Sequence, residues 1–77
     1  MADFKEFDVV KVVKLLHADR RFDGTENVKR SPLVGDQGTI VHLAEDFRQC
    51  VVECVDPDGV TVWLAEFDFG ELEAISS

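Results

Sequence analysis

Gly35-Asp36-Gln37-Gly38-Thr39-Ile40-Val41-His42-Leu43 is the stretch of this chain that decides its fold. Two glycines frame an Asp-Gln pair, and a run rich in β-branched residues follows at once. Because glycine tolerates positive φ and aspartate favours turns, we expect the chain to reverse direction here and to continue as a strand over 39–43. This division predicts one strand and a long loop before the turn, and a meander of short strands after it.

The residues before the turn predict one strand followed by one loop. The segment 7–16 is rich in valine, which favours a strand through its β-propensity, although the apolar spacing also fits one face of a helix. The polar segment 17–34 contains the turn signal Asp23-Gly24, and we expect it to form a loop. Loops of this length in a small domain are often functional, while a solvated surface excursion is the simpler interpretation.

The residues after the turn predict three more strands, over 49–55, 60–67 and 72–75. Asp56-Pro57-Asp58-Gly59 is the clearest hairpin turn, because proline presets φ at the first central position and glycine suits the exit. Five short strands joined by tight turns predict an all-β fold, either a small barrel or a strongly bent sheet. The length of 77 residues fits a single domain, 1–77.

The charge is strongly acidic and unevenly distributed, with a net value of −8. Residues 1–34 hold seven Lys/Arg and six Asp/Glu, giving +1, whereas residues 35–77 hold one Lys/Arg and ten Asp/Glu, giving −9. Such an acidic half repels phosphate backbones, whose binding depends on clustered cations. The pattern therefore disfavours nucleic acid and favours solubility, a basic partner, or both.

The sequence also bears on the compartment of the protein. No apolar run approaches the ~20 residues that span a bilayer, and the charged N-terminal residues lack the apolar segment of a signal peptide. We therefore expect a cytoplasmic protein without a membrane interaction. Two cysteines in such a chain are expected to be free thiols.

The candidate metal ligands and catalytic residues do not form a recognisable site. Cys50 and Cys54 would share one face of a strand at a separation of roughly 13 Å, at ~3.3 Å per residue, which exceeds the reach of a disulfide or of one zinc ion. We expect both to be core residues. His17 and His42 have no cysteine or carboxylate at ligand spacing. With no nucleophile beside a base and no phosphate-binding loop, we expect neither metal, cofactor nor enzymatic activity.

The seven aromatic residues exceed what one small core requires, and they suggest a binding surface. The strand over 60–67 has apolar residues on both faces, so one face must be covered by the long loop, for example through Phe22, by a second subunit or by a partner. An exposed aromatic patch ringed by carboxylates would suit a basic protein surface. The candidate contact residues are Trp63, Phe67, Phe69, Glu66, Asp68 and Glu71.

Several segments together resemble a known kind of protein. They are Val9-Val10-Lys11, Gly35-Asp-Gln-Gly-Thr-Ile-Val41, Val52-Glu-Cys-Val-Asp56, Asp58-Gly59 and Leu72-Glu73. This order resembles an uncharacterised family of small bacterial single-domain proteins with a KOW-like, SH3-like barrel, and it covers most of the chain except 17–33. The resemblance implies an SH3-like small barrel of about five strands with a long first loop. It implies no particular activity, but members that lie beside toxin-like genes hint at immunity or antitoxin roles.

Two functions from different classes follow as hypotheses. The first is a non-catalytic protein-binding module of immunity, antitoxin or regulatory type, monomeric or homodimeric, in which an acidic rim steers a basic partner toward an aromatic anchor. The alternative is a KOW-like RNA- or ribosome-associated domain, because KOW domains bind such partners. It would use the loop cations Arg20, Arg21, Lys29 and Arg30.

Overall fold

The computed structural model describes residues 4–17, 20, 22 and 29–75. It has five strands: β1 (Val9–Val12), β2 (Gln37–Ala44), β3 (Gln49–Val55), β4 (Thr61–Asp68) and β5 (Leu72–Ala74). Two single turns of 3-10 helix, η2 (Glu45–Phe47) and η3 (Phe69–Glu71), join β2 to β3 and β4 to β5. The predicted all-β class is therefore confirmed. Within the described part of the chain, no helix is long and apolar enough to cross a membrane.

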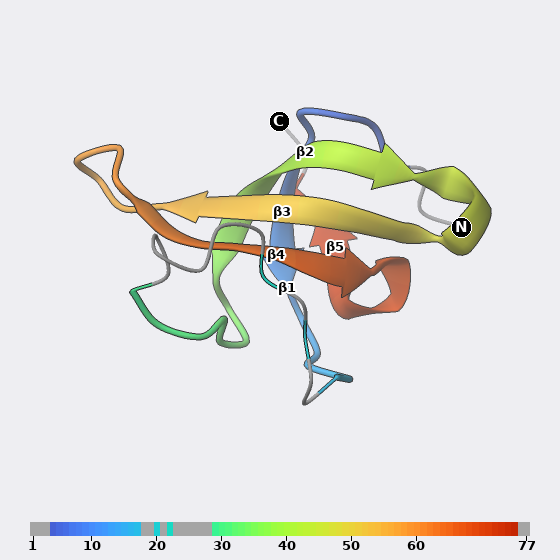
Figure 1. The fold of residues 1–77 in the computed structure, drawn as a ribbon, viewed down its shortest axis with the longest axis horizontal. Helices are drawn as coiled ribbons and strands as arrows, with labels where there is room; N and C mark the ends of the chain where they lie inside the picture. Colours follow the sequence, from blue (N-terminus) through green and yellow to red (C-terminus); the bar gives the residue numbers. More distant parts are fainter. Residues whose placement is uncertain (1–3, 18–19, 21, 23–28, 76–77) are drawn as a thin grey trace.

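The strands form one antiparallel sheet in the order β4-β3-β2-β1-β5. The sheet is strongly bent, so that β2, β3 and β4 lie side by side while β1 and β5 cross behind them (Figure 1). A register shift between Ile40 and His42 marks a bulge in β2, which is the kind of irregularity that bends a sheet. β4 and β5 are the two outer strands, and the sheet is barrel-like without being closed.

The turn lies at 33–36, two residues before the predicted turn at 35–38, because Gln37 and Gly38 already pair with β1. The Asp36 N–H donates to the carbonyl of Leu33 at 3.0 Å. Gly35 has a φ of +100°, which residues other than glycine rarely adopt. Gly38 is required for another reason, because a Cβ there would lie 2.7 Å from the Glu53 carbonyl oxygen of β3. β2 begins two residues earlier than predicted, at Gln37, since its ladder with β1 already starts at this residue.

The first strand is shorter than the predicted range 7–16. At its start, Phe7 has a φ of +72° and sits in a turn closed by the Asp8 N–H on the Lys5 carbonyl. At its end, the N–H groups of Val13 and Lys14 donate to the carbonyl of Glu71 instead of to a neighbouring strand. The chain therefore leaves the β1–β2 ladder after Val12 and turns toward η3.

The core consists of the inward-facing residues of every strand together with Phe4 from the N-terminal segment. The buried apolar residues are Phe4, Val10, Val12, Ile40, Cys50, Val52, Cys54, Trp63, Ala65, Phe67 and Leu72. Both cysteines are free and buried, which confirms their predicted place in the core. Burial raises the pKa of the Cys50 thiol to about 12, so this thiol stays protonated at neutral pH.

Candidate functional site

The predicted aromatic patch does not lie on the surface. Trp63 and Phe67 are 0% and 1% exposed, with ring centroids 5.2 Å apart. Both belong to the inward face of β4, where they pair in register with Cys54 and Cys50 of β3. The structure therefore contradicts the expectation that these two side chains form an exposed patch. Strand alternation places Trp63, Ala65 and Phe67 on one face of β4, and packing of the sheet turns this face inward.

The other predicted aromatic contact, Phe69, is partly buried in η3. Its ring meets that of Phe4 edge-on at a centroid distance of 5.0 Å, and the guanidinium carbon of Arg48 lies 6.0 Å from its centroid. Edge-on pairs of this kind stabilise a fold by about 0.5–1.5 kcal/mol beyond the area they bury. Phe69 therefore contributes mainly to packing at this end of the barrel.

Phe22 and Lys29 of the long loop lie against the outer edge of β4. Phe22 forms an isolated antiparallel bridge with Ala65 and packs against the core, while the Lys29 N–H donates to the Val62 carbonyl at 2.7 Å. These contacts occupy backbone groups that an outer strand would otherwise offer to another chain. The sequence left open three ways to cover the second apolar face of this strand, and one of them was the chain's own loop through Phe22.

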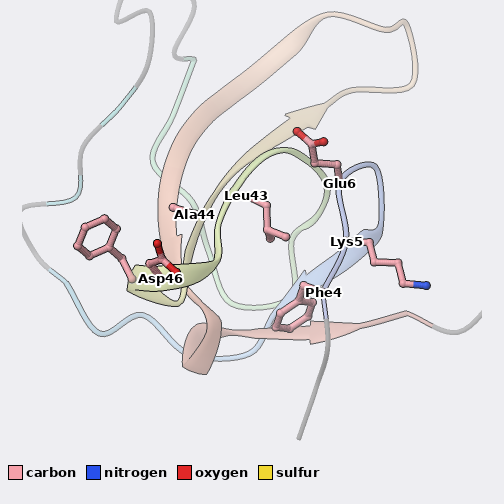
Figure 2. Close-up of a pocket in the computed structure, with 7 residues that line it drawn as sticks. Phe4, Lys5, Glu6, Leu43, Ala44 and Asp46 are labelled. Atoms are coloured by element: carbon pink, nitrogen blue, oxygen red, sulfur yellow. The ribbon is translucent and has the colours of Figure 1, made fainter.

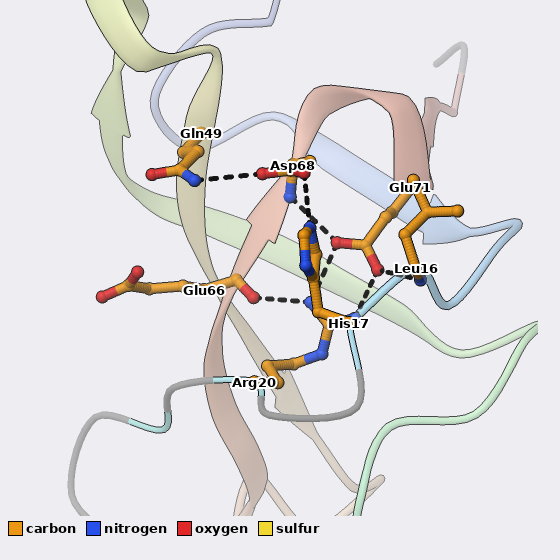
Figure 3. A network of polar contacts seen from close by, with 7 residues as sticks. All are labelled: Leu16, His17, Arg20, Gln49, Glu66, Asp68 and Glu71. Atoms are coloured by element: carbon orange, nitrogen blue, oxygen red, sulfur yellow. Dashed lines mark hydrogen bonds and ion pairs between the residues drawn. The ribbon is translucent and has the colours of Figure 1, made fainter.

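A buried ion pair fastens this loop to the barrel (Figure 3). Glu71 is fully buried, and its two carboxylate oxygens accept hydrogen bonds from both Nη atoms of Arg20. The Nη1 atom also donates to the Glu66 carbonyl at 2.6 Å, and the guanidinium carbon lies 4.0 Å from the centroid of the Phe67 ring. The Arg20 side chain is only 5% exposed as a result.

The Glu71 carboxylate also accepts two backbone hydrogen bonds. The Asp68 N–H donates to Oε1 at 2.9 Å and the Leu16 N–H donates to Oε2 at 2.8 Å. Burial raises the pKa of Glu71, but the hydrogen bonds and the charge of Arg20 outweigh it, and the pKa lies below its usual value. Glu71 is therefore ionised at neutral pH, as half of a buried and fully hydrogen-bonded pair.

His17 extends the same network toward solvent. Its Nε2 atom lies 2.5 Å from Oδ2 of Asp68, whose Oδ1 accepts from the side-chain amide of Gln49 at 3.1 Å. The hydrogen bond with His17 is the main reason that the pKa of Asp68 lies below its usual value. Atoms of His17, Asp68 and Glu71 lie within 4.8 Å of one another, as metal ligands would. The Arg20 guanidinium already supplies a cation to Glu71, so this donor set favours an ion pair over a metal ion.

Three of the four loop cations of the RNA-binding hypothesis are paired with carboxylates of the acidic half. The pairs are Arg20 with Glu71, Lys29 with Asp56 at 3.5 Å, and Arg30 with Asp36 at 2.7 Å. The hydrogen bond from Arg30 is the largest cause that lowers the pKa of Asp36 to about 2. The fourth cation, Arg21, lies outside the described residues. The three described cations therefore neutralise the protein's own acidic groups, which reduces their availability to phosphates.

An open hollow of about 570 Å³ lies where the N-terminal segment passes the end of β2. Figure 2 shows Leu43 pointing into the ring of strands, with Phe4 and Lys5 on the N-terminal segment beside it. The lining residues are Phe4, Lys5, Glu6, Leu43, Ala44, Asp46 and Phe47. We call this the η2 hollow. It combines an apolar floor with charged groups of both signs, as sites for protein side chains do.

Two phenylalanines are highly exposed: Phe47, which lines the η2 hollow, and Phe7, which follows the lining residue Glu6 in sequence. Phe47 is 76% exposed at the end of η2, directly before Arg48, which has a φ of +53°. Phe7 is 74% exposed and has a φ of +72° itself, a conformation that is rare for a bulky residue. Exposed aromatic rings beside unusual backbone conformations often mark interaction sites. Sequence reasoning missed Phe47, although a lone aromatic residue in the polar connector 44–48 was a signal.

Comparison with known proteins adds no further constraint. No protein-family model, no curated protein and no solved structure matches the chain. The resemblance to KOW-like, SH3-like barrels therefore stays a prediction.

Proposed function

We propose that this protein is a non-catalytic protein-binding module of immunity, antitoxin or regulatory type that recognises a basic partner. The observation that carries the proposal is the exposed ring of Phe47 beside the η2 hollow, on a chain with a net charge of −8. Aromatic side chains are the commonest anchors of protein interfaces. The contact surface differs from the one expected from the sequence, because Trp63 and Phe67 are buried.

Charge and shape have separate roles in the proposed mechanism. The negative field of the protein accelerates the encounter with a basic surface, and this effect weakens as salt is added. Phe47 then packs against the partner, and an apolar side chain of the partner enters the η2 hollow above Leu43. Lys5, Glu6 and Asp46 form the polar rim that fixes its orientation.

The ion pairs of the loop favour protein binding over the RNA-binding alternative. Three of the cations required for phosphate contacts already have carboxylate partners. We also propose that the protein is cytoplasmic, which is supported by two free, buried cysteines, because reducing compartments keep thiols in this form.

The test is capture of partners from a lysate of the source cell by immobilised protein, followed by titration of the purified partner. We expect one basic protein to bind at low salt and to be released at high salt. Phe47→Ala should weaken its affinity at least tenfold, a loss typical of an interface anchor. Val60→Ala is the matched control, because Val60 is 46% exposed on the hairpin that joins β3 to β4.

Equal binding by the wild type and Phe47→Ala would overturn the proposed surface. Recovery of RNA or ribosomal proteins, released by salt, would instead support the alternative function. Replacing Lys29 and Arg30 with alanine would then reduce RNA binding and its dependence on salt.

A further inference from the structure

The surroundings of Arg20 have the composition of a binding site for a guanidinium group. The Glu71 carboxylate meets both Nη atoms, the Phe67 ring lies 4.0 Å from the guanidinium carbon, and the Glu66 carbonyl accepts a further hydrogen bond at 2.6 Å. A bidentate carboxylate and an aromatic face are the two groups that select arginine over lysine. We call Glu71, Phe67 and the Glu66 carbonyl the guanidinium site.

The barrel holds this site in place largely without Arg20. Glu66 and Phe67 belong to β4, and Phe67 is in register with Cys50 of β3. Glu71 lies in η3, where its Oε1 atom accepts from the Asp68 N–H at 2.9 Å. Arg20, in contrast, comes from the loop, 51 residues away from Glu71 in sequence. The barrel therefore supplies a preorganised receptor, and Arg20 occupies it as a ligand would.

An open hollow gives access to Arg20 from solvent. It has a volume of about 440 Å³, and its lining includes Arg20 together with Leu15 and Leu16. These leucines are 44% and 58% exposed, and the rest of the lining is His17, Phe22, Ser31 and Pro32, so the approach to the buried ion pair is partly apolar. A second chain could place one arginine and a flanking apolar side chain in this space.

We propose that the guanidinium site is filled in cis by Arg20 and can be filled in trans by an arginine side chain of a basic protein. Exchange of one guanidinium for another leaves Glu71 paired both before and after, so the exchanged state avoids the large cost of an unpaired buried carboxylate. Release of Arg20 would free the loop from this contact with β4. The contact thus acts as an internal competitor that a partner must displace.

The inference rests on the proposed function only in assuming that the partner is basic, and its first test needs no partner. Arg20→Ala empties the site, and the probes are N-acetyl-arginine methylamide and the matching lysine derivative. Fluorescence of Trp63 reports binding, because its ring lies 5.2 Å from that of Phe67. Lys29→Ala is the control variant, since it removes a loop cation that pairs with Asp56 and not with Glu71.

We expect Arg20→Ala to bind the arginine probe at least tenfold more tightly than the lysine probe. We also expect its affinity for the arginine probe to be at least tenfold higher than that of the wild type or of Lys29→Ala. If Arg20→Ala is unfolded in buffer, the readout is refolding, which the arginine probe should restore at concentrations where the lysine probe does not. Equal effects of the two probes, or no effect of either, would overturn the proposal.

Exchange in trans is tested with the wild type and a Leu-Arg-Leu peptide. Nuclear magnetic resonance of 15N-arginine-labelled protein should show the side-chain signal of Arg20 moving toward that of a solvated guanidinium as peptide is added, and a Leu-Lys-Leu peptide should leave it in place. An unchanged signal would refute exchange in trans even if Arg20→Ala binds the probe. Unchanged partner capture by Phe47→Ala, together with selective binding of the arginine probe by Arg20→Ala, would overturn the proposed η2 surface and leave the guanidinium site standing, so the two proposals fail separately.

Discussion

Replacing Arg20 with alanine should remove about 3–5 kcal/mol from the free energy of unfolding at pH 7. This is the usual cost of removing one partner from a buried ion pair, because the remaining carboxylate stays away from water without its cation. The side chains of Arg20 and Glu71 are 5% and 0% exposed, so the full cost applies here. A chain of 77 residues has a total stability of about 4–11 kcal/mol, and the variant will therefore be close to unfolding.

The dependence of this loss on pH follows from the sign of the Glu71 shift. In the wild type the pKa of Glu71 is lowered, so its contribution to stability is present above the unfolded pKa of about 4.5 and is lost as the pH falls through the folded pKa. Without Arg20 the folded pKa of Glu71 rises, because burial acts with less opposition. The stability difference between the wild type and Arg20→Ala should therefore narrow as the pH is lowered from 7 to 4.

Urea unfolding followed by Trp63 fluorescence measures both effects, and a double-mutant cycle with Glu71→Gln separates the pair from general packing. Arg20→Ala should cost less in the Glu71→Gln background, where no carboxylate is left unpaired. Lys29→Ala is the control, because its pair with Asp56 is exposed and screened by solvent, and we expect its loss to change the free energy of unfolding far less than the loss of Arg20. A loss for Arg20→Ala no larger than that of Lys29→Ala, or a difference independent of pH, would refute the reasoning.

Three further substitutions test the fold and the placement of the aromatic residues. Gly38→Ala should destabilise the protein by about 1–3 kcal/mol, because the new Cβ would lie 2.7 Å from a backbone oxygen of β3, and a melting temperature equal to that of the wild type would contradict this packing. Trp63→Ala should cost about 3–5 kcal/mol, whereas a folded variant with lost partner binding would restore the original surface hypothesis. Phe7→Gly should raise the melting temperature by a few degrees, because glycine adopts a positive φ without strain and the exposed ring contributes little burial. A lower melting temperature would show that the ring has packing contacts.

Local chemistry was sufficient to predict the all-β class and a succession of five strands. Strand alternation and the turns at Gly35 and Gly59 act over a few residues, and the alternating burial of β3 follows its sequence pattern. The predicted core position of Cys50 and Cys54 followed from the same period of two. The strand ends were not predictable in this way. β1 ends at Val12 because the next N–H groups donate to the carbonyl of Glu71, which is distant in sequence.

The tertiary structure alone decided where the functional candidates lie. A period of two indicates that β4 has two faces, but only packing against β3 and the loop determines that Trp63 and Phe67 face inward. The pairing of Arg20 with Glu71 spans 51 residues, so no local pattern could reveal it. The sequence by itself determined the excess of acid in residues 35–77, whereas the folded chain determined which carboxylates the loop neutralises, because ion pairs depend on distance in space.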